Sequence, residues 1–426
     1  MTMISRRTLT GLTIGAIAVT AAGCGRGSDE PGSSSAPSTL AEGKATGDLT
    51  VWAMGAEGEA LSQLVKKFET DNPEVKLSVT PVPWDSAHSK FTSAIAAGTT
   101  PDVAQIGTTW MGEFVGLKAL DQTPANFDTS VFFEGAHKTT EVKGASYAVP
   151  WYVETRVIYY RKDLAEKAGV TEAPADWDAL KALAKAYKDK AGAKWGISLQ
   201  PGGTGSWQGV LPFMWSNGGQ ISNEDATEFT FEDPKNVEAL AYFKSFFDEG
   251  LANKAPAEGT TEQDFVSGAV PMFISGPWMM ASVEKLGGAG FKDKYDVVVM
   301  PKKETSASFI GGANLGVFTA SKNRDAAWKL VQYLTDPAVQ VEWFKIVAAL
   351  PAVKSSWDDA SVSGDEKLAV FGKQLETAFA PPSIPTWEQI AGKFDAQVEQ
   401  VCKQGLDPAQ ALRATQTEAQ SIGTGS

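Results

Sequence analysis

The chain has 426 residues, of which 51 are Asp or Glu and 38 are Lys or Arg, so its formal net charge is −13. A surface this acidic repels nucleic acid and anionic lipid, which excludes the classes of protein that bind them. With two histidines and two cysteines, the chain is poorly supplied for histidine-rich metal sites and for most Ser–His or Cys–His catalytic arrangements. We therefore expect no metal and no cofactor.

The N-terminal segment is typical of an export signal. Arg6 and Arg7 precede an apolar stretch, Leu9 to Ala22, that is too short to span a bilayer permanently. Ala21-Ala22-Gly23-Cys24 resembles a lipoprotein cleavage site, although Ala21 stands where such signals more often have Leu. Ser5 to Leu9 resembles a twin-arginine signal. We predict a signal peptide over residues 1–23 and a lipid on Cys24; an ordinary signal peptide with an incidental cysteine is the alternative.

The segment 24–47 has almost no bulky apolar side chains, which predicts a flexible tether behind the lipidated cysteine. No later apolar run approaches the roughly 20 residues of a spanning helix, so the lipid is the expected membrane contact, at the extracellular face. Removing Arg6 and Arg7 with residues 1–23, which contain no acid, would take the net charge from −13 to −15. Cys402, the other cysteine, is expected to be a small core residue on a C-terminal helix.

Strand and helix patterns alternate in the body of the chain. Leu49–Trp52, Val75–Val79 and Val103–Ile106 read as strands, and the segments between them have helical periodicity. Two long helices are predicted further on, at 177–191 and 236–249. These alternations predict an α/β fold with a mostly parallel sheet, and about 400 residues favour two lobes. Three Asp-Pro pairs are typical of helix starts: Asp233-Pro234, Asp336-Pro337 and Asp407-Pro408.

Several motifs follow one another in an order that resembles a known family: NPEVKLSV (72–79), FTSAIAAGTTPDV (91–103), VPWYVETRVIYYRKDL (149–164), GPWM (276–279) and GGANLGVFTASKN (311–323). The chain from Leu49 to about Ile422 resembles the extracellular solute-binding proteins of sugar ABC importers, the group that includes maltose-binding proteins. The resemblance implies two α/β lobes, a hinge, an interlobe cleft for ligand and a permease partner. It implies one lobe of residues 48–155 plus 311–350 and another of 156–310 plus 351–426.

A pyranose has weakly polar faces and a rim of hydroxyls, so its receptor needs aromatic rings beside fixed polar groups. The chain places such residues after its first three strands, where ligands bind in open α/β sheets. The candidates there are Glu57, Trp84, Asp85, Thr108, Thr109 and Trp110. The two carboxylates and the threonines could instead cap helices, and Trp110 could belong to the core.

Further candidates lie near the expected hinge and in the second lobe: Trp151, Tyr152, Glu154, Trp207, Gln208, Trp278, Gly312, Asn314 and Trp387. Trp278 matches the tryptophan that the family has after Gly-Pro, and the glycine pair at 311 and 312 matches the family's second crossing. For each tryptophan a core position is the alternative. The glycine-rich stretch 202–208 has no lysine to complete a phosphate-binding loop.

These features predict a monomer that binds an oligosaccharide of two or more units, closes around it and delivers it to a permease without catalysis. Two alternatives stay open. A secreted glycoside hydrolase would also be acidic and rich in aromatic residues. The same fold could also hold another polar solute, and Glu57, Asp85 and Glu154 would suit a cation.

Overall fold

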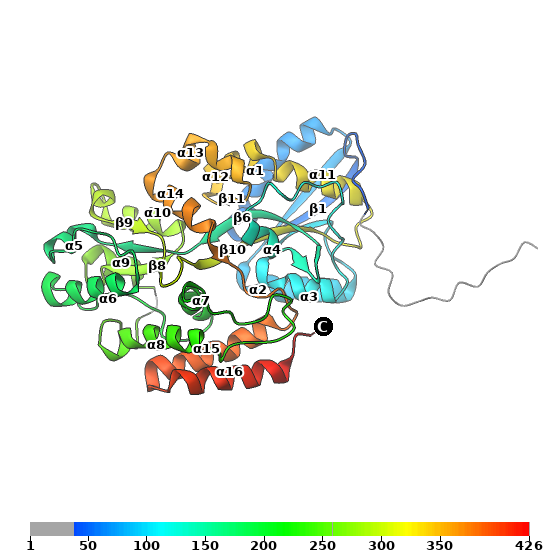
Figure 1. The fold of residues 1–426 in the computed structure, drawn as a ribbon. Helices are drawn as coiled ribbons and strands as arrows, with labels where there is room; N and C mark the ends of the chain where they lie inside the picture. Colours follow the sequence, from blue (N-terminus) through cyan, green and yellow to red (C-terminus); the bar gives the residue numbers. More distant parts are fainter. Residues whose placement is uncertain (1–37, 258, 426) are drawn as a thin grey trace, which may run out of the picture. The chain divides into compact units, whose positions relative to one another are not determined.

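The computed structural model describes residues 38–257 and 259–425, with the side chain of Asp85 excepted. The predicted signal peptide, Cys24 and residues 25–37 lie outside this part of the chain. Within it, helices and strands alternate along the sequence (Figure 1), which confirms the α/β prediction.

The strands in the described residues form three sheets. They are β1 (Gly47–Met54), β2 (Val75–Val82), β3 (Val103–Gly107), β4 (Glu141–Val142), β5 (Ala145–Ser146), β6 (Val149–Thr155), β7 (Val157–Tyr160), β8 (Met272–Ser275), β9 (Asp296–Val298), β10 (Ser308–Val317), β11 (Leu350–Pro351) and β12 (Ala378–Phe379). The large sheet has the order β11-β6-β10-β3-β1-β2, with β12 paired to β10; β8-β7-β9 and β4-β5 form the others.

The large sheet is mixed. β1 pairs in parallel with β2 and β3, as expected for strands joined through helices. β10 runs antiparallel to both β3 and β6, and β11 runs antiparallel to β6. The prediction of a mostly parallel sheet is therefore wrong, because β10 enters the sheet from a distant part of the sequence that no local pattern connects to β3.

The α-helices of the described residues are α1 (Gly55–Asp71), α2 (Trp84–Ala97), α3 (Met111–Gly116), α4 (Glu134–Lys138), α5 (Lys162–Lys167), α6 (Trp177–Ala186), α7 (Trp207–Ser216), α8 (Pro234–Asp248), α9 (Thr261–Ser267), α10 (Trp278–Gly287), α11 (Arg324–Leu334), α12 (Pro337–Val347), α13 (Ala360–Ser363), α14 (Glu366–Leu375), α15 (Trp387–Gln404) and α16 (Pro408–Ile422). Shorter helical segments are η1 (Thr108–Trp110), η2 (Tyr187–Ala191), η3 (Phe291–Lys294) and η4 (Lys354–Asp358).

Local sequence signals place the helix ends. At all three Asp-Pro pairs the aspartate carboxylate accepts from backbone N–H groups of the first turn, which confirms these as helix starts. α1 buries Leu61, Leu64, Val65 and Phe68 on one face. It ends at Asp71, and the next residue, Asn72, caps it: the backbone N–H and the side-chain amide of Asn72 both donate to the carbonyl of Phe68.

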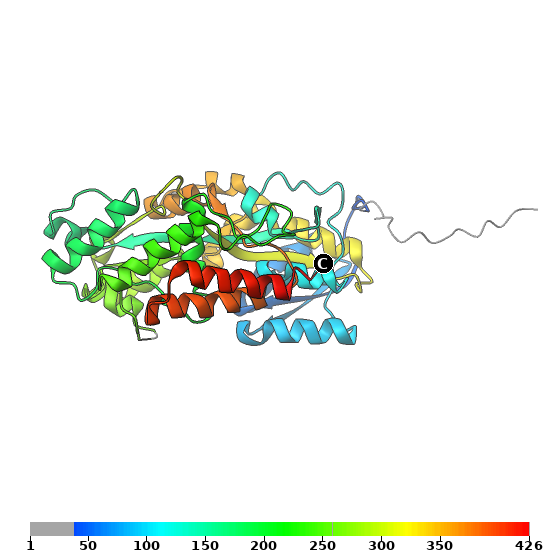
Figure 2. The same ribbon diagram turned by 60° about the horizontal axis from the view of Figure 1, so that its bottom comes forward.

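Three apolar cores lie behind the sheets and helices. One is built from α6, α7, α8, α15 and α16, and it contains Cys402 as predicted. Burial raises the pKa of the Cys402 thiol to about 12. A second core lies on the large sheet and the β8-β7-β9 sheet, and a third lies under α2 and α3. α15 and α16 lie side by side along α8 (Figures 1 and 2).

The chain passes between the large sheet and the β8-β7-β9 sheet at two neighbouring places. β6 ends at Thr155 and β7 begins at Val157, so Arg156 alone joins them. The return runs from β9 to β10 through residues 299–307. These passages lie beside the boundaries expected at 155 and 311. Independent movement of two lobes about them stays a prediction.

The last part of the expected tether is attached to the folded body. Leu40 exchanges two hydrogen bonds with the side chain of Asn126, and the N–H of Ala45 donates to Asn72 Oδ1 at 2.9 Å. Ala45 is buried. Residues 40 and 45 of the predicted flexible tether are thus held to the folded body by hydrogen bonds with the side chains of Asn126 and Asn72, which composition does not reveal. In the described part of the chain, no helix has both the length and the apolarity needed to cross a bilayer.

Candidate functional site

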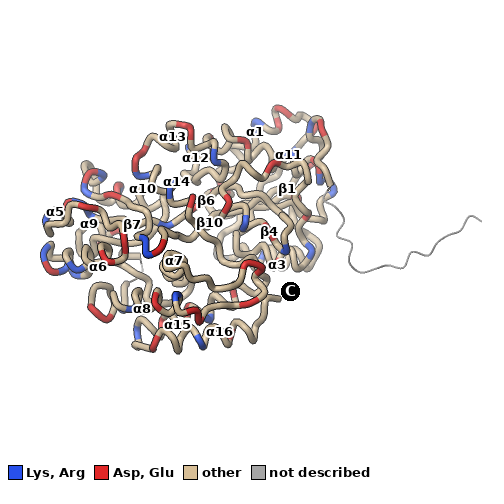
Figure 3. Tube along the Cα trace, viewed as in Figure 1, with Lys and Arg blue, Asp and Glu red and all other residues tan. Residues whose placement is uncertain are grey.

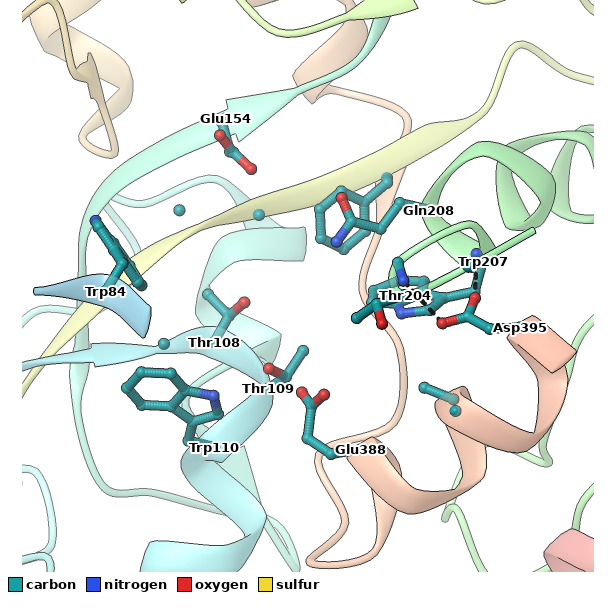
Figure 4. Close-up of a pocket in the computed structure, with 18 of the residues that line it drawn as sticks. Trp84, Thr108, Thr109, Trp110, Glu154, Thr204, Trp207, Gln208, Glu388 and Asp395 are labelled. Atoms are coloured by element: carbon teal, nitrogen blue, oxygen red, sulfur yellow. Dashed lines mark hydrogen bonds between the residues drawn. The ribbon is translucent and has the colours of Figure 1, made fainter. Parts of the chain in front are cut away.

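A cavity of about 520 Å³ lies between two walls (Figure 4). One wall comes from the start of α2 and the β3–η1 junction. The other comes from the loop before α7, the start of α7 and one side of α15. The strands β6 and β10 cross between them. The lining residues are Trp84, Gly107, Thr108, Thr109, Trp110, Tyr152, Glu154, Gly203, Thr204, Gly205, Trp207, Gln208, Phe309, Gly311, Gly312, Glu388, Ala391, Gly392, Asp395, Ala396 and Glu399.

A second cavity of about 320 Å³ shares Trp84, Tyr152 and Glu154 with the first. Its other walls are Glu57 from α1, Trp278 at the start of α10 and the connection from α12 to β11. The remaining lining residues are Val153, Pro277, Val347, Ala348, Ala349 and Leu350. Three shared residues make the two cavities neighbouring parts of one site, which we call the first and second cavities.

The β6 strand presents alternate side chains to the cavities. Tyr152 and Glu154 are partly exposed and line both cavities, whereas Trp151 and Thr155 are buried and line neither. Val153 is also buried and borders only the second cavity. The ring of Trp151 is fully buried and stacks on Trp343 at 5.0 Å between centroids. The prediction that Trp151 stacks on a ligand is wrong, because this residue points to the core side of the strand.

Tyr152 links the floor of the site to the body of the large sheet. Gln105 Nε2 donates to its hydroxyl at 3.3 Å, and Gln105 Oε1 accepts from the N–H of Met54 at 2.6 Å. Burial raises the pKa of Tyr152, and the nearby carboxylates Glu57 and Glu154 add to this. Burial also raises the pKa of Glu57, although a hydrogen bond with Tyr152 opposes the shift. The floor is thus a polar network in which a carboxylate and a phenol are both partly withdrawn from water.

The first wall carries two indole rings. Trp84 is 41% exposed, and its ring meets that of Trp110 edge-on at 6.2 Å. Trp110 also packs against His88, which is 2.8 Å from Glu113. Thr108 and Thr109 are partly exposed beside these rings, so hydroxyl groups and ring faces line the same surface (Figure 4). Asp85 is the second residue of α2. The structure does not describe its side chain, so its contact with a ligand stays a prediction.

Trp278 supplies a third exposed indole, 45% accessible, at the start of α10. The absence of a side chain at Gly276 makes this possible, because a Cβ there would lie 2.0 Å from the Trp278 ring. The guanidinium of Arg156 lies over the ring, 4.7 Å from its centroid. The Gly-Pro-Trp motif therefore places an indole on the wall of the second cavity and keeps it there.

The opposite wall is held together by Asp395 of α15. Its carboxylate accepts from the N–H groups of Gly205 and Trp207 and from Ser206 Oγ, each at 2.8 Å (Figure 4). It thereby caps the start of α7, where a negative charge is favourable. Burial raises the pKa of Asp395, while these hydrogen bonds act to lower it. Gly202 completes the junction, since a Cβ there would lie 2.6 Å from Glu399 Cα.

Three predicted residues of this region are buried. Trp207 meets the Trp387 ring edge-on at 5.3 Å, although it also lines the first cavity. Trp387 is fully buried beneath it, so its prediction as an exposed platform is wrong. Asn314 is also buried and exchanges hydrogen bonds with Thr139 Oγ1, so its prediction as a ligand contact is wrong as well. Both side chains are used in packing; Gly312, in contrast, lines the first cavity.

The structure brings most of the predicted residues together: Glu57, Trp84, Thr108, Thr109, Trp110, Tyr152, Glu154, Trp207, Gln208, Trp278 and Gly312. Ligand contact by them stays a prediction. Sequence reasoning missed Phe309 and the α15 side, where Glu388, Asp395 and Glu399 recur at helical spacing with Ala and Gly between them. That spacing of acids and small residues on one side of an amphipathic helix was a usable signal.

The lining of both cavities contains carboxylates and no Lys, Arg or His among the described residues. Elsewhere acidic and basic residues are interspersed, as along α5 and α6 (Figure 3). No cluster of three or more potential metal ligands occurs in the described part of the chain. Arg156, which lies outside the lining, pairs with Glu154 at 3.2 Å. Ring faces, hydroxyls, an amide and carboxylate acceptors, with no cationic side chain in the lining itself, suit a neutral, hydroxyl-rich ligand.

Comparison with known proteins agrees with this geometry. A binding protein of Brucella abortus is 30% identical over 373 residues, which cover 86% of this chain and 90% of the relative. The diacetylchitobiose-binding protein DasA of Streptomyces coelicolor is 26% identical, with 97% and 98% covered. The structure of the sugar-binding protein MalE of Xanthomonas citri superposes with a TM-score of 0.83 at 28% identity, over 88% of this chain and 97% of that one.

The similarity to MalE confirms the two-lobed binding-protein fold with a ligand cleft that the sequence predicts. Residues 53–341 match the family described as bacterial extracellular solute-binding protein. The matched segment is more than half of the chain and contains the β8-β7-β9 sheet, the strands β2, β3, β6 and β10 of the large sheet, and residues of both cavities. This chain belongs to the bacterial extracellular solute-binding proteins.

Proposed function

We propose that this protein captures a neutral oligosaccharide in the two cavities and delivers it, chemically unchanged, to an ABC permease. A lipid on Cys24 would hold it at the extracellular face of the membrane. The relatives named for diacetylchitobiose and for sugar binding support the ligand class.

The observation that carries the proposal is the pair of half-exposed indoles, Trp84 and Trp278, on the walls of a polar site. Each ring leaves a large apolar area open in the site, and a ligand that covers it gains the free energy of removing that area from water. Sugar rings present apolar C–H faces of matching size, and their hydroxyls can pair with groups such as Glu154, Thr108 and Gln208.

Two features favour an oligosaccharide over a monosaccharide and a neutral sugar over an acidic one. The second cavity continues the first through Trp84, Tyr152 and Glu154, so a chain of sugar units can occupy both. The carboxylates of the lining would repel a carboxylated or phosphorylated sugar.

A thermal-shift panel of neutral and acidic oligosaccharides tests the proposal. A ligand at a hundred times its Kd should add about 2.7 kcal/mol to the free energy of unfolding, which is about 3 °C for a chain of this size. Each mixture should also be assayed for new reducing ends. Stabilisation by neutral oligosaccharides without cleavage is expected. No stabilisation by any sugar, or release of reducing ends, would contradict the proposal.

The anchor has its own test. Cells that express the Cys24→Ser variant should release the protein into the soluble fraction, whereas the wild type should partition with membranes. Equal distribution of both forms would show that Cys24 is not lipidated.

A further inference from the structure

We propose that Arg156 is a positioning residue that joins the two cavities into one binding site. It is not among the residues that line either cavity, but its side chain contacts residues from both. This inference rests on the proposed function, because it concerns the affinity for the same ligand.

The backbone of Arg156 is fixed at the passage between the two sheets. Ser308 Oγ donates to its carbonyl at 2.7 Å and accepts from its N–H at 3.3 Å. Next to it, Thr155 Oγ1 donates to the carbonyl of Phe309 at 2.8 Å. Hydrogen bonds thus join the two chain passages at the backbone of Arg156. They fix the direction in which the Arg156 side chain leaves the backbone.

The guanidinium orients two polar groups of the lining. Nη2 lies 3.2 Å from Glu154 Oε1 and donates to Gln208 Oε1 at 3.1 Å. A guanidinium only donates, so the amide oxygen of Gln208 must face it and the NH₂ group remains available as a donor to a ligand. The second oxygen of Glu154 likewise remains available as an acceptor. Arg156 therefore sets a donor and an acceptor side by side.

The same guanidinium packs against two aromatic rings of the lining. Its Cζ lies 4.7 Å from the ring centroid of Trp278, in the second cavity, and 5.7 Å from that of Phe309, in the first. Only 14% of the Arg156 side chain is exposed, so water competes little for these contacts. One side chain thus restrains Trp278, Gln208 and Glu154 at once.

Arg161 shows how an arginine with a structural role differs. It lies at the end of β7, away from both cavities, and its guanidinium makes four hydrogen bonds, to both carboxylate oxygens of Asp163 and to the carbonyls of Phe265 and Val266. In contrast, Nη1 of Arg156 is buried and has no partner among the described residues. An unpaired buried donor costs free energy, so the position of Arg156 is not optimised for stability alone.

The test compares three variants by the Kd for the oligosaccharide that most stabilises the wild type, and by the melting temperature without ligand. Arg156→Met keeps the aliphatic part and should raise the Kd about tenfold or more, as expected when one charge-assisted hydrogen bond is lost. Arg156→Lys keeps the positive charge but loses the forked N–H donors of the guanidinium, and it should raise the Kd by a smaller factor. Arg161→Met, the matched control, should lower the melting temperature and leave the Kd within about twofold.

A double-mutant cycle shows whether Arg156 acts through Gln208. If it does, Arg156→Met should weaken binding much less in a Gln208→Ala background than in the wild type. Equal losses in both backgrounds, or an unchanged Kd in the Arg156 variants, would overturn the inference. If Arg156→Met fails to fold, Arg156→Lys decides, and a wild-type Kd in that variant contradicts the proposal. A wild type that binds no sugar would instead refute the proposed function.

Discussion

Replacement of Trp278 by Ala should weaken sugar binding strongly. The ring is 45% exposed, and a tryptophan side chain offers at most about 250 Å², so roughly 110 Å² of it is open to a ligand. A sugar that covers half of this area removes about 55 Å² of the ring and about 55 Å² of its own surface from water, or about 110 Å² in total. At about 25 cal/mol per Å², the ring contributes about 2–3 kcal/mol, or roughly 30- to 150-fold in Kd.

Isothermal titration measures this loss, with Trp195→Ala as the matched control. Trp195 is also partly exposed and has a lysine, Lys188, over its ring at 5.7 Å, but it lines neither cavity. Both variants lose ring packing and a cation–π contact, so both should melt somewhat earlier than the wild type. Only Trp278→Ala should change the Kd. A Kd within about twofold of the wild type in Trp278→Ala, or an equal loss of affinity in Trp195→Ala, would show that the Trp278 ring does not contact the sugar.

Three further predictions concern the same site. Gly276→Ala should raise the Kd by displacing the Trp278 ring, although residue 276 contacts no ligand; titration with unchanged affinity would show that the ring position is not critical. Burial raises the pKa of Glu57 above its ordinary 4.5, so the folded state loses stability as the pH rises from 4.5 through the raised pKa. Glu57→Gln should therefore melt higher than the wild type at pH 7, and the difference should disappear below pH 4.5 in a melting series. A uronic-acid analogue of the bound sugar should bind much more weakly in competition titrations, with recovery of affinity as the carboxylates are protonated.

Short-range sequence patterns were enough to predict several helices and strands. Interactions within a few residues determine the apolar spacing of α1, the strands β1 to β3 and the three helix starts at Asp-Pro pairs. The antiparallel entry of β10 could not be predicted in this way. It depends on pairing between residues such as Gly107 and Ala313, which lie far apart in the sequence.

On β6, the alternation of side chains between the two faces of the strand could predict which residues face the cavities. The choice of Trp151 for its aromatic ring alone could not. Trp151 and Tyr152 are adjacent on β6 and point to opposite faces, so only one can face the cavities. Glu154 shares a face with Tyr152, and a carboxylate favours the solvent side; this alternation would have assigned Trp151 to the core. No such local signal existed for Arg156, because its partners Gln208, Trp278 and Phe309 come from three distant segments.

The proposed function requires that the two cavities hold a neutral oligosaccharide without altering it. Equilibrium dialysis of the protein against the most stabilising oligosaccharide, followed by mass spectrometry of the sugar released on denaturation, measures both binding and chemical change. We expect one sugar per chain, recovered with its original mass, and little retention by Trp278→Ala. Shorter sugars in the bound fraction, or equal retention by the wild type and Trp278→Ala, would contradict it.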